Sequence, residues 1–347
     1  MRIAVVIAIS GAAVAVAVAL VPAGSPRPVT LRLASPGDSA APRTTAHTPT
    51  ATRRDTARAP HAPFAVGLRF EVLVDHGRTV HFANGTVAPR RLLTEIRYPA
   101  LGPPRSGDAR NAPPARTAGP FPLIVFGHGF GVTPGTYAPL MRAWARAGFV
   151  VAAPLFPDEN PRAPGGPTAE DLPNEPEDMS FVISTMIAAD HSKAGPFHGL
   201  LDPARIAVTG HSDGGDTALA AAYDPRLRDR RIGAAMILSG AFIPQLGTFT
   251  FPAYGPPLLA TQGSVDPINL PSATSAFFDV ARPPKYLLTL TGASHLPPYT
   301  TQQPQLAIIE RVTLAFLRYY LDRERNARHA LLSAGNVSGL ATLQAYP

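Results

Sequence analysis

A serine, an acid and a histidine are spaced along this chain as nucleophilic catalysis requires. Ser212 stands in the pentapeptide 210–214, Gly-His-Ser-Asp-Gly, between a β-rich run at 206–209 and an Ala-rich run at 217–222. This order predicts a strand, a sharp turn with the serine at its apex, and a helix. A side chain at either glycine of the turn would collide with a neighbouring strand or helix. The alternative is a plain Gly/Ser turn.

The acid and the base follow the serine, each directly after a run that reads as a buried strand. Residues 257–261 lead into the turn that carries Asp266, and residues 285–290 lead into the loop that carries His295. Because parallel strands end at one sheet edge, we expect these side chains to converge with Ser212. His295 would then take the serine proton, and Asp266 would orient the imidazole and stabilise the imidazolium.

Other residues compete with Asp266 for the role of the acid. Asp266 precedes a proline and could belong to an ordinary Asp-Pro turn. Asp279 lies inside a helical run, which makes it a poorer candidate. Asp158 and Glu159 follow another predicted strand but precede the serine, so they are minor competitors.

A glycine-rich turn follows the predicted strand at 121–126. Residues 127–131 read Gly-His-Gly-Phe-Gly, and their glycines allow a backbone amide to face a reacting carbonyl oxygen. We assign the N–H of Phe130 as one oxyanion-hole donor, with Gly129 as the alternative, and the N–H of Asp213 as the second donor. A glycine loop without this role is the competing interpretation.

Two histidines, His128 and His211, lie inside these two motifs, and we expect them to brace the loops by hydrogen bonds. Together with His295 they could be drawn as a zinc site. No His or Cys ligand spacing supports such a site, so we expect neither a metal nor a cofactor.

An aromatic, proline-broken stretch at 240–254 follows the predicted strand at 232–239. We expect Phe242, Phe249 and Phe251 to form an apolar wall for the substrate, with packing on the core as the alternative. The acidic stretch at 156–178 either borders the cleft as a partial lid or is a solvated insertion.

The composition supports one sizeable domain. The chain has 347 residues, is 45% hydrophobic and contains no cysteine, which excludes disulfides and a thiol nucleophile. Strand-like and helix-like runs alternate between 121 and 320, which predicts an α/β fold with a mostly parallel sheet flanked by helices. We place this domain at 63–325 and leave 326–347 as a C-terminal tail without a functional interpretation.

The N-terminal residues resemble an export signal. Met1 and Arg2 precede an apolar run at 3–21, and small residues suit cleavage after Ala23, so 1–23 is expected to be a signal peptide. The run is also long enough for an uncleaved membrane anchor. Residues 24–62, rich in Pro, Ala, Thr, Ser and Arg, are predicted to be a disordered linker. We therefore expect a secreted or envelope-associated protein.

The positive charge is concentrated before the predicted domain. The formal net charge is +7, and residues 1–62 hold seven arginines and two aspartates, which is most of that excess. Such a segment could contact an anionic envelope. The predicted domain shows no basic stripe with interleaved aromatic residues, which argues against a nucleic-acid partner. The sequence does not set the oligomeric state.

With these motifs in view, the chain resembles the secreted bacterial α/β-hydrolases related to chlorophyllases, platelet-activating-factor acetylhydrolases and bacterial cutinases. Five stretches carry the resemblance: residues 94–100, 126–131, 147–154, 178–182 and 210–215. The resemblance implies an α/β-hydrolase fold and carboxylic ester hydrolysis without a cofactor. It assigns Ser212 as the nucleophile, His295 as the base and Asp266 as the acid, with amides of Phe130 and Asp213 as oxyanion donors.

One departure from the family limits the expected substrate. Bacterial cutinases commonly have Met after the serine, where this chain has Asp213. A carboxylate at this position would disfavour binding of esters whose groups are anionic or strongly hydrophobic. We therefore expect a small-molecule or lipid-like ester, cleaved through an acyl-enzyme intermediate. The alternatives are acyl transfer to an envelope alcohol and a non-catalytic surface binding module.

Overall fold

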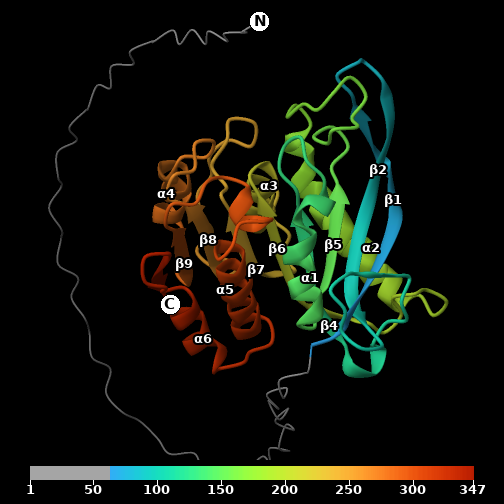
Figure 1. Cartoon of the computed structure of the whole chain (residues 1–347). Coiled ribbons are helices and arrows are strands. Elements are labelled where there is room, and N and C mark those ends of the chain that lie inside the picture. The colour runs from blue at the N-terminus through green and yellow to red at the C-terminus, as the bar shows by residue number, and fades with distance from the viewer. Residues whose placement is uncertain (1–62) are drawn as a thin grey trace, which may run out of the picture. The chain divides into compact units, whose positions relative to one another are not determined.

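The computed structural model describes residues 63–347, which are built around a ten-stranded sheet with the strand order β10-β9-β8-β7-β6-β4-β5-β2-β1-β3 (Figure 1). The predicted signal peptide at 1–23 and the predicted linker at 24–62 lie outside the described residues. Among residues 63–347, no helix is both long and apolar enough to span a bilayer.

The N-terminal side of the sheet is a long antiparallel hairpin. Strand β1 (Ala65–His81) pairs with β2 (Val87–Ala100), and β2 pairs antiparallel with β5 (Val150–Leu155). The two-residue strand β3 (Ala109–Arg110) pairs with β1 at the outer edge. The segment 101–120 thus contributes a short strand and a 3-10 turn at Arg116–Ala118.

The remaining strands run parallel and carry the predicted site segments at their carboxyl ends. They are β5 and, in chain order, β4 (Phe121–Gly127), β6 (Leu201–His211), β7 (Ile232–Leu238), β8 (Leu258–Gly263) and β9 (Lys285–Leu290). Every residue of β4 is buried, as expected for a strand covered on both faces.

Helices cover both faces of the sheet (Figure 1). Those packed on one face are α1 (Ala138–Arg146), α5 (Gln305–Tyr320) and α6 (Ala327–Ala334), and those on the other are α2 (Glu175–His191), α3 (Asp213–Tyr223) and α4 (Pro271–Val280). Alternate side chains of β4 point to opposite faces of the sheet. Ile124 and Phe126 therefore pack in the core beneath α1, α5 and α6, and Leu123 and Val125 pack in the core beneath α2, α3 and α4. The predicted α/β class, a mostly parallel sheet flanked by helices, is confirmed.

The segment 326–347, set apart above as a tail, completes the sheet. Helix α6 packs on α5, and β10 (Ala341–Tyr346) pairs antiparallel with β9. The folded part therefore extends past residue 325. The added strand covers the backbone N–H and C=O groups on the outer side of β9, which would otherwise form an open sheet edge.

Candidate active site

The predicted nucleophile stands on a strained turn. Ser212 links β6 to α3 and has φ 54° and ψ −127°, a conformation that L-residues rarely adopt. A Cβ added to Gly210 would lie 2.0 Å from the carbonyl oxygen of Gly214, and one added to Gly214 would lie 2.3 Å from the backbone of Gly127. Gly210 is thus required because β6 passes directly against the start of α3, and Gly214 because the elbow packs on the backbone of β4.

The predicted acid and base are hydrogen bonded to each other. His295 Nδ1 lies 2.8 Å from Asp266 Oδ2. Asp266 is buried, and its Oδ1 accepts the backbone N–H groups of Ile268 (2.9 Å) and Asn269 (3.1 Å), while Gln262 Nε2 lies 3.3 Å from Oδ2. The carboxylate is therefore held in place, and it fixes the proton on Nδ1, which leaves Nε2 free to accept a proton.

The serine hydroxyl lies at the same sheet edge but is not hydrogen bonded to the imidazole. Among residues 63–347 its only hydrogen-bond partner is Asp213 Oδ1, at the long distance of 3.5 Å. The ring of His295 lies 4.5 Å from that of His211, the residue before the serine. Hydrogen bonds of this kind often tighten only when substrate binds.

The glycine-rich turn after β4 lies against the serine. A Cβ on Gly129 would be 3.1 Å from Ser212 Cβ, a tight contact that a larger residue could make only if the neighbouring atoms shifted. The Gly129 N–H is directed to the hydroxyl of Tyr137 at 3.3 Å. The Phe130 N–H has no hydrogen-bond acceptor within residues 63–347. Of the two amides considered for the first donor of the oxyanion hole, Phe130 and Gly129, the amide of Phe130 is therefore the one free to donate to an oxyanion.

The second assigned amide, that of Asp213, has an acceptor in its own side chain. The Asp213 carboxylate bonds its own N–H and faces the hydroxyl of Ser212. Burial raises the pKa of Asp213, against the opposing effects of Glu159, Ser212 and His295. An oxyanion bound at this amide would have to displace the Asp213 carboxyl group.

His128 braces the oxyanion loop. Its Nε2 accepts the N–H of Phe156 at 2.9 Å, which leaves Nδ1 to donate to the carbonyl of Gly129 at 2.9 Å. Burial lowers the pKa of His128 to about 4, so the ring is neutral near pH 7. The loop is thereby tied to the end of β5.

His211 links the oxyanion loop to the base. Its Nδ1 accepts the Tyr137 hydroxyl at 2.8 Å, and its Nε2 donates to the carbonyl of His295 at 3.0 Å. Burial lowers the pKa of His211 to about 3. Together with the bond from Gly129, this makes a continuous chain from the loop to the His295 backbone. Sequence reasoning missed Tyr137, whose only signal is an aromatic residue at the start of a helix.

No metal-binding arrangement is found in the described part of the chain, where no group of three or more His, Asp or Glu side chains could hold an ion. The histidines considered for zinc, His128 and His211, use both ring nitrogens in the hydrogen bonds above.

Buried carboxyl groups from the stretch 156–178 and α2 lie behind the elbow. Burial, and then the Asp213 carboxylate, raise the pKa of Glu159 to about 9. No hydrogen-bond donor among residues 63–347 reaches either Glu159 oxygen, and its polar neighbours are the carboxyl groups of Asp213 and Glu175. Two neighbouring carboxyl groups can form a hydrogen bond with each other only if one of them is protonated. Glu159, weighed above as a competing acid, therefore contacts Asp213 and not the histidine base. Because Glu159 is buried, this part of the stretch 156–178 is not a solvated insertion.

The three phenylalanines expected to line the substrate site form a cluster. Phe242 packs on Phe249 and on Phe277 of α4, and Phe251 packs on Tyr223 of α3. They line a cavity of about 460 Å³ whose wall includes no triad residue. Their role as a substrate wall stays a prediction, and their contacts are those of core packing.

Comparisons with known proteins agree with this fold. The family model described as Chlorophyllase matches residues 79–236, just under half of the chain. That range contains both glycine motifs and Ser212 but ends before Asp266 and His295. A comparison with curated proteins found no match.

Among solved structures, the chain is similar to a ferulic acid esterase from Streptomyces cinnamoneus, with a TM-score of 0.57 and 22% identity over 78% of this chain and 93% of that one. At this identity the likeness concerns the fold. The chain has the α/β-hydrolase fold. Together, the family match and the structural match support an ester hydrolase of that type.

Proposed function

We propose that this protein is a serine esterase that cleaves carboxylic esters through an acyl-enzyme intermediate. Nε2 of His295 takes the proton of Ser212 Oγ as that oxygen attacks the ester carbonyl carbon. The imidazolium then returns the proton to the leaving alcohol as the C–O bond breaks. Water, activated by the same nitrogen, cleaves the acyl-enzyme and releases the acid.

Three further groups stabilise charge in this scheme. Asp266 holds the proton on Nδ1 and balances the imidazolium. The amides of Phe130 and Asp213 donate to the oxyanion of the tetrahedral intermediate. The observation that carries the proposal is the 2.8 Å bond between His295 and Asp266 at the sheet edge where Ser212 stands on its strained turn.

We propose a small-molecule or lipid-like ester as the substrate, because the chlorophyllase match and the likeness to a ferulic acid esterase both point to small esters. The carboxyl group of Asp213 beside the nucleophile disfavours anionic acyl groups. We also propose that residues 1–23 direct export and that residues 24–62 link the enzyme to the envelope.

The test compares Ser212→Ala with Ser272→Ala, a control at an exposed position at the start of α4. Turnover of a chromogenic short-chain ester should fall about a thousandfold or more in Ser212→Ala and stay unchanged in the control. A fluorophosphonate probe should label the wild type and the control only. Wild-type turnover by Ser212→Ala would refute the proposal, and an unlabelled, inactive wild type would favour a binding module. Acyl-glycerol formed in added glycerol would indicate acyl transfer.

A further inference from the structure

Two buried side chains, those of Tyr137 and His211, connect the oxyanion loop (residues 127–131) to the proposed base, His295. The Gly129 N–H donates to the Tyr137 hydroxyl at 3.3 Å, and that hydroxyl donates to His211 Nδ1 at 2.8 Å. His211 Nε2 then donates to the carbonyl oxygen of His295 at 3.0 Å. Tyr137 and His211 each accept one bond and donate the next, so the bonds of this row strengthen one another. The mechanism proposed above uses neither side chain.

The direction of this row is fixed by its two ends. The His295 carbonyl can only accept, so His211 carries its proton on Nε2 and leaves Nδ1 to accept from Tyr137. Burial raises the pKa of Tyr137, so the hydroxyl keeps the proton that it donates. Tyr137→Phe would therefore remove two bonds at once and take from the Gly129 N–H the acceptor that it has here.

The first end of the row sets the direction of the Phe130 amide. The Gly129 N–H is bonded to Tyr137, and the Gly129 carbonyl accepts from His128 Nδ1 at 2.9 Å. In a planar trans peptide, the N–H of Phe130 points away from that carbonyl. Because Tyr137 and His128 hold both polar groups of Gly129, they fix the direction of the amide assigned to the oxyanion.

The second end of the row holds the base. The backbone carbonyl of His295 accepts from His211, and the two rings lie 4.5 Å apart. The imidazole of His295 is bonded through Nδ1 to Asp266 at 2.8 Å. His211 and Asp266 therefore hold the backbone and the ring of the base separately. The backbone contact leads back through Tyr137 to the oxyanion loop.

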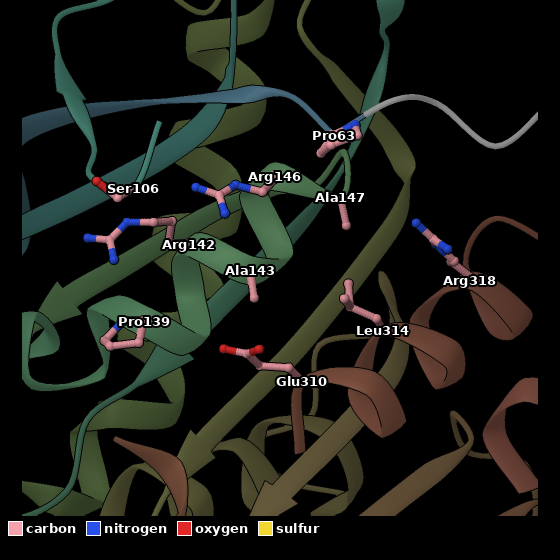
Figure 2. A pocket seen from close by; sticks show the side chains of 10 residues that line it. All are labelled: Pro63, Ser106, Pro139, Arg142, Ala143, Arg146, Ala147, Glu310, Leu314 and Arg318. Carbon is pink, nitrogen blue, oxygen red and sulfur yellow. The ribbon is translucent and has the colours of Figure 1, made fainter. Parts of the chain in front are cut away.

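Tyr137 is itself held by the helix that follows it. Helix α1 begins at the next residue, and Trp144 of α1 donates its indole N–H to Thr313 of α5 at 2.9 Å in the core. On its other side α1 borders a cavity of about 450 Å³ with α5, where Ala143 and Leu314 lie (Figure 2). No residue of the row lines that cavity. Contact with α5 thus holds α1, which carries Tyr137 at its N-terminal end.

We propose that Tyr137 and His211 are positioning residues of the proposed esterase, which hold the Phe130 amide and the His295 base in a fixed relation to each other. The inference rests on the proposed function, because both ends of the row would act on the same tetrahedral intermediate. The amide donates to its oxyanion, while the imidazolium protonates its leaving oxygen. The row should therefore matter more for the transition state than for binding of the ester.

The test compares Tyr137→Phe with the matched control Tyr98→Phe. Tyr98 is also buried, and its hydroxyl donates to the carbonyl of Ala112 at 2.8 Å, near the opposite end of the sheet. For each full-chain variant, kcat and KM are measured with a neutral chromogenic ester. Binding of butylboronic acid, which forms a tetrahedral adduct with an activated serine, reports on the transition state. Labelling by a fluorophosphonate probe reports on the serine, and urea unfolding shows that a loss of kcat is not a loss of folded protein.

We expect Tyr137→Phe to lower kcat by about tenfold or more, while KM stays within about twofold of wild type. Binding of butylboronic acid should weaken by a similar factor to kcat. Tyr98→Phe should match the wild type in all three quantities. His211→Asn, which cuts the row at its other end, should also lower kcat. The double variant Tyr137→Phe/His211→Asn should lose less than the product of the two single losses, because both act on one row.

An unchanged kcat in Tyr137→Phe, or equal losses in Tyr137→Phe and Tyr98→Phe, would overturn the inference. A loss that appears in KM alone would also overturn it. Failure of the proposed function gives a different result, because a wild type that the fluorophosphonate probe does not label refutes the esterase and the inference with it. A labelled wild type beside an unaffected Tyr137→Phe refutes the inference only.

Discussion

Replacing Glu159 with glutamine should change how the stability of this protein depends on pH. Glu159 is fully buried, and burial together with Asp213 raises its pKa to about 9, from 4.5 in a free side chain. The folded protein therefore keeps this proton at a pH where the unfolded chain has lost it. Stability is then fully present below pH 4.5 and decreases as the pH rises toward the folded-state value.

The size of the effect follows from one proton. Where the folded state holds one more proton than the unfolded chain, the free energy of unfolding falls by about 1.4 kcal/mol for each pH unit. Between pH 6 and pH 8 this amounts to about 2.7 kcal/mol. Glutamine keeps the shape and can donate an N–H to Asp213, but it cannot titrate. The contribution of Glu159 should therefore vanish in Glu159→Gln.

The assay is urea unfolding of the full chain at pH 6, 7 and 8. The difference in unfolding free energy between Glu159→Gln and the wild type should move in favour of the variant by about 2.7 kcal/mol from pH 6 to pH 8. Glu170→Gln, at an exposed position of the same stretch, is the control and should follow the wild type. Parallel pH curves for Glu159→Gln and the wild type would refute the shared-proton argument.

Three further substitutions test the site and the turn. Asp266→Asn should lower kcat for a neutral chromogenic ester by about a thousandfold to ten-thousandfold, since the imidazole loses its tautomer and its counter-charge; a loss below tenfold would remove Asp266 from the triad. Asp213→Asn should raise kcat/KM for an anionic ester, relative to a neutral one, by roughly fivefold, from about 1 kcal/mol of relieved repulsion, and an unchanged ratio would contradict this. Gly210→Ala should cost roughly 2 kcal/mol or more in urea unfolding, because its Cβ would lie 2.0 Å from the Gly214 oxygen. Gly107→Ala, where a Cβ meets nothing within 4 Å, should cost far less, and equal costs would contradict the packing argument.

Much of the fold and the triad could be predicted from the sequence because their signals are local. The alternation of apolar strands and helical runs predicted a mostly parallel sheet with helices on both faces, as observed. The order of Ser212, Asp266 and His295, each after a strand, predicted that they would meet at one edge. The glycines at 210 and 214 could be recognised from five adjacent residues, since the strained turn at Ser212 is a local backbone property. The Gly127 backbone that excludes a side chain at 214 is distant in sequence.

Contacts between distant segments could not be read in the same way. The bond chain from Gly129 through Tyr137 to His211 joins residues whose spacing has no periodic signal. The pairing of β10 with β9 depends on an open edge that exists only once the sheet has formed.

The sequence by itself determined which residues are candidates for the chemistry and at which edge of the sheet they lie, because those features follow from short motifs and strand order. Only the tertiary structure decided which groups lose contact with water. Burial brings Glu159 against Asp213 and raises the pKa of Glu159. Desolvation and charge pairing depend on all neighbours in space, which no local stretch of sequence specifies.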